Sequence, residues 1–80
     1  MDQRVINHVH VLRSSAHITQ EQLAKVIGVT RQTIIAIEKG NYTPSVLLAL
    51  KIAKYFNKQV EEVFEYKEDD ILNVVKDNTS

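Results

Sequence analysis

The chain has 80 residues, 44% of them hydrophobic, with two glycines and one proline, a composition typical of one small folded domain. It contains no apolar run near the roughly 20 residues of a membrane-spanning helix, no secretory signal pattern, and no cysteine for disulfides, thiolate zinc sites or nucleophilic catalysis. The net charge is zero, but the charges are unevenly distributed. Residues 1–58 hold eight Lys and Arg against three Asp and Glu, whereas residues 59–80 hold two Lys against seven Asp and Glu. This distribution fits either a polyanionic partner for the basic part or two differently solvated surfaces.

The first two expected helices are defined by their ends and their apolar spacing. The first follows Asn7, a candidate cap, and carries apolar residues at helical spacing, namely Val9, Leu12 and Ala16. The second begins at Thr19, because Thr19 and Gln22 have the spacing of a capping box. It ends at Gly28, where a left-handed backbone is cheap. Its expected inward residues are Leu23, Ala24 and Ile27.

The third expected helix runs from Thr30 to Gly40 and has two different faces. Ile34 and Ile37 share one face, which is expected to pack on the core. The other face presents basic, amide and small or aliphatic groups together: Arg31, Gln32, Ile35, Ala36 and Lys39.

The fourth expected helix starts at Pro44 and Ser45 and closes at Asn57. Its apolar surface is broad enough to predict a central place in the core, and comprises Val46, Ala49, Leu50, Ile52, Ala53 and Phe56. The opposite face carries Leu47, Lys51, Lys54 and Lys58. A short fifth helix is expected over about residues 60–64.

Two further features lie near the ends of the chain. Val5 and Ile6 near the start and residues 64–67 near the end are short extended patterns that predict a small two-stranded sheet. Residues 69–80 form an acidic extension. Within it Ile71, Leu72, Val74 and Val75 fit a short amphipathic helix that docks on the body, on a second subunit or on another protein.

The segment from Thr19 to Ser45, TQEQLAKVIGVTRQTIIAIEKGNYTPS, carries a specific pattern. Two helices that cross steeply after a tight turn need a small residue at the crossing and a flexible residue in the turn, which Ala24 and Gly28 supply. Over roughly residues 9–64 the chain resembles the helix-turn-helix domains of Cro/CI-type (XRE) transcriptional regulators. The resemblance depends on a combination of residues: Ala24, Gly28, Arg31, Gln32, Ile37, Glu38, Gly40 and Pro44.

The resemblance implies an all-α, lambda-repressor-like domain of five helices within residues 1–68, with the third helix in the DNA major groove. The expected terminal strands are similar to those of the compact, cytolysin-repressor-like members, from which the chain departs by continuing over residues 69–80. The outward face of the third helix has the chemistry to read base edges, since Arg suits guanine, an amide suits adenine and an aliphatic group suits the thymine methyl. The expected base contacts are Arg31, Gln32, Ile35 and Ala36. Arg31 could instead bind a phosphate, and Ile35 could be exposed without contacting DNA.

Backbone contacts are expected at both ends of the helix pair. The start of the second helix offers unpaired amides to a phosphate, and Gln20 there matches the family pattern, although a solvated first-turn residue is the alternative. The full set of expected phosphate contacts is Gln20, Thr30, Thr33, Lys39 and Asn41.

Two other sets of residues have expected structural roles. The resemblance implies a largely buried ion pair between Arg13 and Glu38 that joins the first helix to the third. Since one helix buries too little DNA for tight specific binding, a homodimer on a palindromic site is expected. Its interface is predicted at Tyr42, Thr43, Val60 and Val63, with a place in the core as the alternative for the two valines.

The three histidines do not predict a metal site. His8 and His10 lie two residues apart, so their side chains leave a helix on different sides. His17 occupies a turn position where the family often has Gly, which predicts a positive φ. No catalytic arrangement and no cofactor motif is identifiable, so an enzyme is not expected.

The sequence therefore predicts a cytoplasmic, double-stranded-DNA-binding transcriptional regulator, acting as a homodimeric repressor without a sensor domain. A repressor is favoured because blocking a promoter requires only occupancy. The alternative is an antitoxin-like or adaptor module whose residues 69–80 bind a partner protein.

Overall fold

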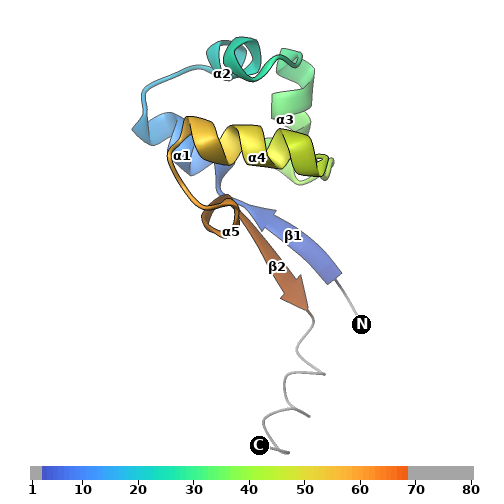
Figure 1. Ribbon diagram of the computed structural model, residues 1–80. Coiled ribbons are helices and arrows are strands. Elements are labelled where there is room, and N and C mark those ends of the chain that lie inside the picture. Colours follow the sequence, from blue (N-terminus) through green and yellow to red (C-terminus); the bar gives the residue numbers. More distant parts are fainter. Residues whose placement is uncertain (1–2, 69–80) are drawn as a thin grey trace, which may run out of the picture.

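Five short helices and a two-stranded antiparallel sheet make up residues 3–68, the part of the chain that the computed structural model describes (Figure 1). In chain order they are β1 Gln3–Asn7, α1 Val9–Ser15, α2 Gln20–Ile27, α3 Arg31–Lys39, α4 Val46–Tyr55, α5 Val60–Val63 and β2 Phe64–Glu68. The predicted fold class is confirmed, including the terminal sheet. The helix predicted in residues 69–80 lies outside the described residues.

The ends of α2 and α3 follow from local hydrogen bonds. Thr19 Oγ1 accepts from the amide of Gln22 at 3.0 Å and the Thr19 amide donates to Gln22 Oε1 at 2.8 Å, so the predicted capping box is present. Gly28 ends α2 at φ +90°, a conformation that L side chains adopt only with strain. Thr30 then caps α3 by accepting from the amide of Thr33. These caps give a tight turn between the two helices.

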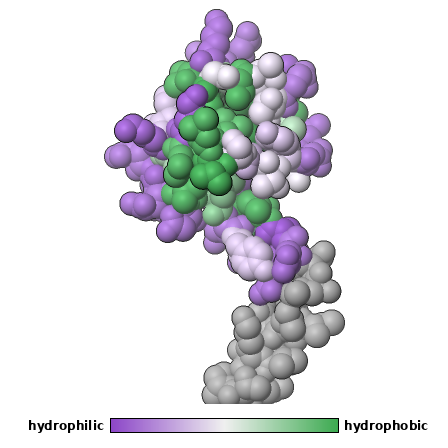
Figure 2. Space-filling model, turned by 45° about the vertical axis from the view of Figure 1, so that its right-hand side comes forward, coloured by the Kyte–Doolittle hydropathy of each residue, from purple (hydrophilic) through white to green (hydrophobic). Residues whose placement is uncertain are grey.

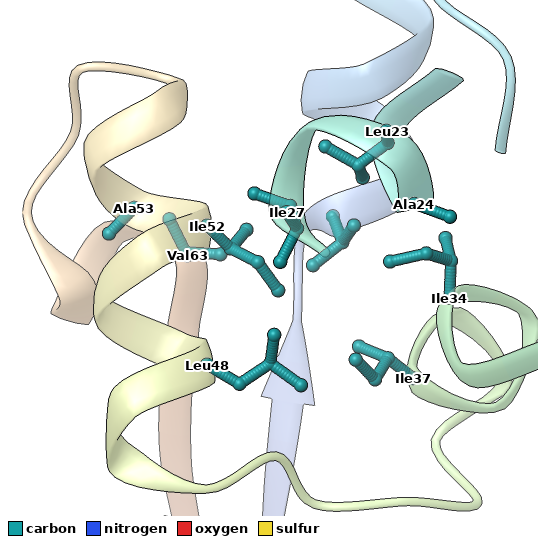
Figure 3. Close-up of a cluster of buried hydrophobic side chains, with 10 residues drawn as sticks. Leu23, Ala24, Ile27, Ile34, Ile37, Leu48, Ile52, Ala53 and Val63 are labelled. Atoms are coloured by element: carbon teal, nitrogen blue, oxygen red, sulfur yellow. The ribbon is translucent and has the colours of Figure 1, made fainter. Parts of the chain in front are cut away.

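The core lies between the helices and is entirely apolar. Figure 3 shows side chains from α2, α3, α4 and α5 pointing toward one another. The buried residues are Val9, Leu23, Ala24, Ile27, Ile34, Ile37, Leu48, Ile52, Ala53 and Val63. Each large aliphatic side chain removed from water contributes about 1.5–3 kcal/mol. Ile34 and Ile37 therefore anchor α3 from behind and leave its other face outward, as predicted.

The prediction for α4 holds for Ala49, Ile52, Ala53 and Phe56, which are buried or half-buried, but it is wrong for Val46 and Leu50 and it omits Leu48. Leu48, Ile52 and Ala53 are buried, but Val46 is 77% and Leu50 is 51% exposed. The apolar surface of α4 is wider than the stripe that α2 and α5 cover, and a helical pattern does not show which part of it has a neighbour. The helical body in Figure 2 accordingly shows hydrophobic surface on its visible face.

The sheet joins the two ends of the described chain. β1 and β2 pair antiparallel, with Val5 opposite Tyr66 and Gln3 opposite Glu68, and in Figure 1 both strands extend away from the helices. Asn7 links the sheet to α3, because its Nδ2 donates to the carbonyl of Ile37 at 2.8 Å.

Two local predictions near α1 have different outcomes. The N-cap is His8 rather than Asn7, although Asn7 Oδ1 still accepts from the amide of Val9. His17 has φ +59°, so the predicted positive φ is confirmed. In residues 3–68 the longest helix is the ten-residue α4, and none of the helices there could cross a bilayer.

Candidate nucleic-acid interface

The outward face of α3 carries the residues predicted to read bases. Arg31 and Gln32, in its first turn, are exposed, whereas Ile35 and Ala36, one turn further, are half-buried. The first pair carries hydrogen-bonding groups, and the second pair is aliphatic. The arrangement therefore places hydrogen-bond donors at the N-terminal end of this face and aliphatic side chains along its middle.

The residues predicted to contact phosphates lie around this face. Lys39 and Asn41 are exposed at the C-terminal end of α3. At the other end the hydroxyls of Thr30 and Thr33 lie 3.1 Å apart, and Thr30 Oγ1 also caps the helix. The structure thus distributes hydrogen-bond donors over both ends of α3.

An open groove lies where the start of α2 meets the start of α3. Its lining brings together two predicted DNA contacts and one member of the predicted ion pair, and comprises Arg13, Thr19, Gln20, Glu21 and Arg31. Arg31 adds a guanidinium and Gln20 an amide to this lining, both suited to an anion, whereas the Arg13 guanidinium is paired with Glu38 and Glu21 adds a carboxylate. Arg31 belongs both to this groove and to the face of α3 predicted to read bases.

The predicted ion pair between Arg13 and Glu38 is present beneath this groove. Arg13 Nε donates to Glu38 Oε2 at 2.7 Å and Arg13 Nη2 donates to Glu38 Oε1 at 3.2 Å, a bidentate arrangement. The side chains are 13% and 7% exposed. Arg13 Nη1 also donates to the carbonyl of Ile18 at 3.0 Å, so the guanidinium joins α1, the following turn and α3.

Two contacts of this ion pair were not predicted. Gln20 Nε2 donates to Glu38 Oε1 at 3.1 Å. His10 Nδ1 lies 3.0 Å from Arg13 Nη2 and 3.4 Å from Glu38 Oε1. The contacts with Glu38 depend on how α1, α2 and α3 pack, and the spacing of the residues along the chain gives no signal for them, whereas His10 and Arg13 are neighbours on α1 three residues apart.

The hydrogen bonds lower the pKa of Glu38. Burial raises this pKa, but donation from Arg13 and Gln20, the charge of Arg13 and the neighbouring His10 together hold it below its usual value. Because the folded pKa lies below the unfolded one, the folded chain binds fewer protons over this range. The stability that Glu38 contributes is therefore complete above the unfolded pKa and is lost as the pH falls through the folded pKa.

The lowered pKa of Glu38 makes the stability of the domain depend on pH in a measurable way. We expect the free energy of unfolding of Glu38→Gln to be lower than that of the wild type at pH 6, with the difference shrinking below about pH 4.5. Urea unfolding followed by circular dichroism at pH 6, 5, 4 and 3 tests this, with the exposed Glu21→Gln as the control variant. A difference that stays constant over this pH range would contradict the assignment.

The residues predicted for a subunit interface divide into two groups. Tyr42 and Thr43 are exposed and Val60 is half-buried. Val63 is 0% exposed within a single chain, so it belongs to the core and its assignment to an interface is corrected. Val46 and Leu50, which are exposed, were not predicted as interface candidates. The signal that could have identified them is the apolar surface of α4, which is wider than one packed face requires.

Lys51 has a contact that the pattern of α4 did not reveal. Its Nζ donates to the carbonyl of Ile27 at 3.1 Å, in the last turn of α2. A cation there satisfies a terminal carbonyl and interacts favourably with the helix dipole. Lys51 therefore holds α4 against the turn of the helix pair.

Two of the three described histidines, His8 and His10, make side-chain contacts with charged residues. His8 Nε2 is 2.6 Å from Glu65 Oε1, a contact between the start of α1 and β2 that lowers the pKa of Glu65. His10 belongs to the Arg13 and Glu38 cluster. Within residues 3–68 no group of three His, Cys, Asp or Glu side chains is placed to hold a metal ion.

Comparison with known proteins agrees with this arrangement. A helix-turn-helix family model matches residues 11–63. An uncharacterised HTH-type transcriptional regulator of Methanocaldococcus jannaschii is 53% identical over 64 residues, which are 80% of this chain and 97% of that protein. The cryptic phage CTXphi transcriptional repressor RstR of Vibrio cholerae is 33% identical over 65 residues, 81% of this chain and 59% of that one.

A solved structure gives the same result for the fold. The restriction-modification controller protein C.AhdI from Aeromonas hydrophila superposes with a TM-score of 0.63 at 28% identity, covering 68% of this chain and 82% of that protein. The residues matched by the family model, 11–63, include α2, the turn after it and α3. The chain therefore belongs to the Cro/CI-type (XRE) family of helix-turn-helix, DNA-binding transcriptional regulators.

Proposed function

We propose that the protein is a cytoplasmic, sequence-specific repressor that binds a palindromic DNA operator as a homodimer, with α3 in the major groove. The observation that carries this proposal is the division of α3, whose Ile34 and Ile37 are buried while Arg31 and Gln32 are exposed. A helix anchored in this way can enter the groove without losing its packing. The phage repressor among its relatives supports the sign of regulation.

Each group around α3 has a role that its chemistry suits. Gln32 binds adenine through its amide, Arg31 binds guanine or a phosphate, and the half-buried Ile35 and Ala36 contact thymine methyl groups. The phosphates on either side are held by Lys39, Asn41, Thr33, Thr30 and Gln20, which fix the position of α3 along the groove.

The homodimer is supported by the apolar side chains left exposed on α4. Val46 and Leu50 lie one turn apart, and Leu50 shares a hollow with Val60 of α5. With Thr43 and Tyr42 they form a surface that a second copy covers around a two-fold axis. The two α3 helices then lie about 34 Å apart, one turn of the duplex.

We expect Leu50→Glu to convert the dimer into a monomer, because two carboxylates would be buried at the two-fold contact. Sedimentation equilibrium over a range of concentrations measures the change. Val11→Glu is the matched control, since Val11 is a 60% exposed valine on α1, and it should sediment as the wild type does. A wild-type monomer, or a Leu50→Glu dimer, would exclude this interface.

Selection from a random double-stranded DNA library, followed by footprinting, tests the function as a whole. The expected result is a palindrome whose half-sites are centred about one helical turn apart. Recovery of no preferred sequence would reject the proposal. If the protein selected no DNA sequence but a pulldown captured a stoichiometric protein partner, the antitoxin-like or adaptor alternative would replace the repressor proposal.

A further inference from the structure

One carboxylate links three helices beneath the groove. Glu38, on α3, accepts hydrogen bonds from Arg13 of α1 and from Gln20 of α2, at distances of 2.7–3.2 Å. Its side chain is 7% exposed, so it makes these contacts away from bulk water. Arg13 and Gln20, by contrast, both line the open groove. Glu38 therefore lies behind two groups that face a site suited to an anion.

The contact with Glu38 determines the orientation of the Gln20 amide. An ionised carboxylate only accepts hydrogen bonds, so the nitrogen of the amide, and not its oxygen, must face Glu38. The low pKa of Glu38 means that it is ionised at neutral pH. An amide nitrogen has two N–H groups, and Glu38 takes one of them. The second remains for another acceptor.

We propose that Glu38 is a positioning residue for DNA binding, which orients Gln20 so that its second amide N–H donates to a phosphate oxygen held in the groove between Arg13 and Arg31. This inference rests on the proposed function, since it assigns a task to a residue that itself does not touch DNA. Arg13 compensates the charge of Glu38, so the carboxylate can lie close to a polyanion.

The proposal predicts an effect opposite in sign to simple electrostatics. Removing a carboxylate near DNA should strengthen binding by reducing repulsion. In Glu38→Gln, however, an amide that keeps its oxygen on Arg13 Nε, the shorter of the two Arg13 contacts at 2.7 Å, places its nitrogen at the Oε1 position, which faces Gln20. Two donors then face each other, Gln20 turns over, and its carbonyl oxygen meets the phosphate. Binding is therefore expected to weaken.

A double-mutant cycle on the full chain tests this coupling. Affinity for the selected DNA site is measured by fluorescence anisotropy at pH 8. Glu38→Gln and Gln20→Ala are each expected to weaken binding about tenfold, the effect of one hydrogen bond to a charged group. The double variant should bind as Gln20→Ala does, because the two changes remove the same contact.

The controls separate positioning from folding. Circular dichroism establishes that each variant is folded at the assay temperature. Glu21→Gln removes a carboxylate from the same groove without changing the partner of Gln20, and it should bind DNA equally or more tightly. If Glu38→Gln does not fold, Glu38→Asp replaces it in the cycle, since it keeps the charge opposite Arg13 but is one methylene shorter.

Each outcome is decisive. Unchanged or tighter binding by Glu38→Gln would overturn the inference. Additive losses, with the double variant about a hundredfold weaker than the wild type, would mean that Glu38 acts only through the structure of the domain and would also overturn it. A wild-type protein that binds no DNA would instead reject the proposed function, which is a separate result.

Discussion

Arg13→Met is expected to lower the free energy of unfolding by about 3–5 kcal/mol, because it leaves the carboxylate of Glu38 largely buried without its cation. The reverse change, Glu38→Leu, should have a similar effect by leaving the guanidinium unpaired. The double variant Arg13→Met/Glu38→Leu should recover most of the loss, since two apolar side chains of similar volume can replace a buried ion pair with little net change. Urea unfolding followed by circular dichroism measures all three.

The comparison needs an exposed side-chain contact as its control. His8 and Glu65 are in contact but are 40% and 45% exposed, so Glu65→Gln should unfold close to the wild-type midpoint. If the double variant were as unstable as either single variant, Arg13 and Glu38 would stabilise the domain through their separate contacts, such as that of Arg13 with Ile18, rather than through each other.

Gln32→Ala is expected to lose about 1–3 kcal/mol of binding free energy on the selected DNA site and little on random DNA, because a base contact is made only with the correct sequence. Lys39→Ala is the matched comparison. It removes a phosphate contact, so it should weaken binding to both DNAs and reduce the slope of log affinity against log salt by about one. Equal losses on the two DNAs for Gln32→Ala would remove Gln32 from base recognition.

Local chemistry made the elements of this fold predictable. Thr19, Thr30 and Ser45 accept hydrogen bonds from amides within their own helices, and Gly28 and Gly40 take positive φ, so these residues define helix ends without reference to the rest of the chain. The inward and outward faces of α3 could be predicted for a similar reason. Its apolar stripe is narrow and has one orientation that buries it.

Packing between distant segments decided what could not be predicted. The apolar surface of α4 admits several orientations, and only contact with α2 and α5 selects Leu48 and Ile52 over Val46 and Leu50. The donation from Gln20 to Glu38 joins residues 18 positions apart. Their meeting depends on the crossing of α2 and α3, a geometry that a sequence pattern specifies only in outline.

The pairing of β1 with β2 has a consequence for how the protein is made. Gln3 meets Glu68, so the sheet requires the closure of nearly the longest loop that this segment of chain allows, and such closure is slow compared with helix formation. During synthesis β1 leaves the ribosome before β2, with an unpaired backbone edge that other chains could pair with. Pairing with β2 covers one side of β1, and synthesis through residue 68 thereby becomes a condition for protecting that side from aggregation.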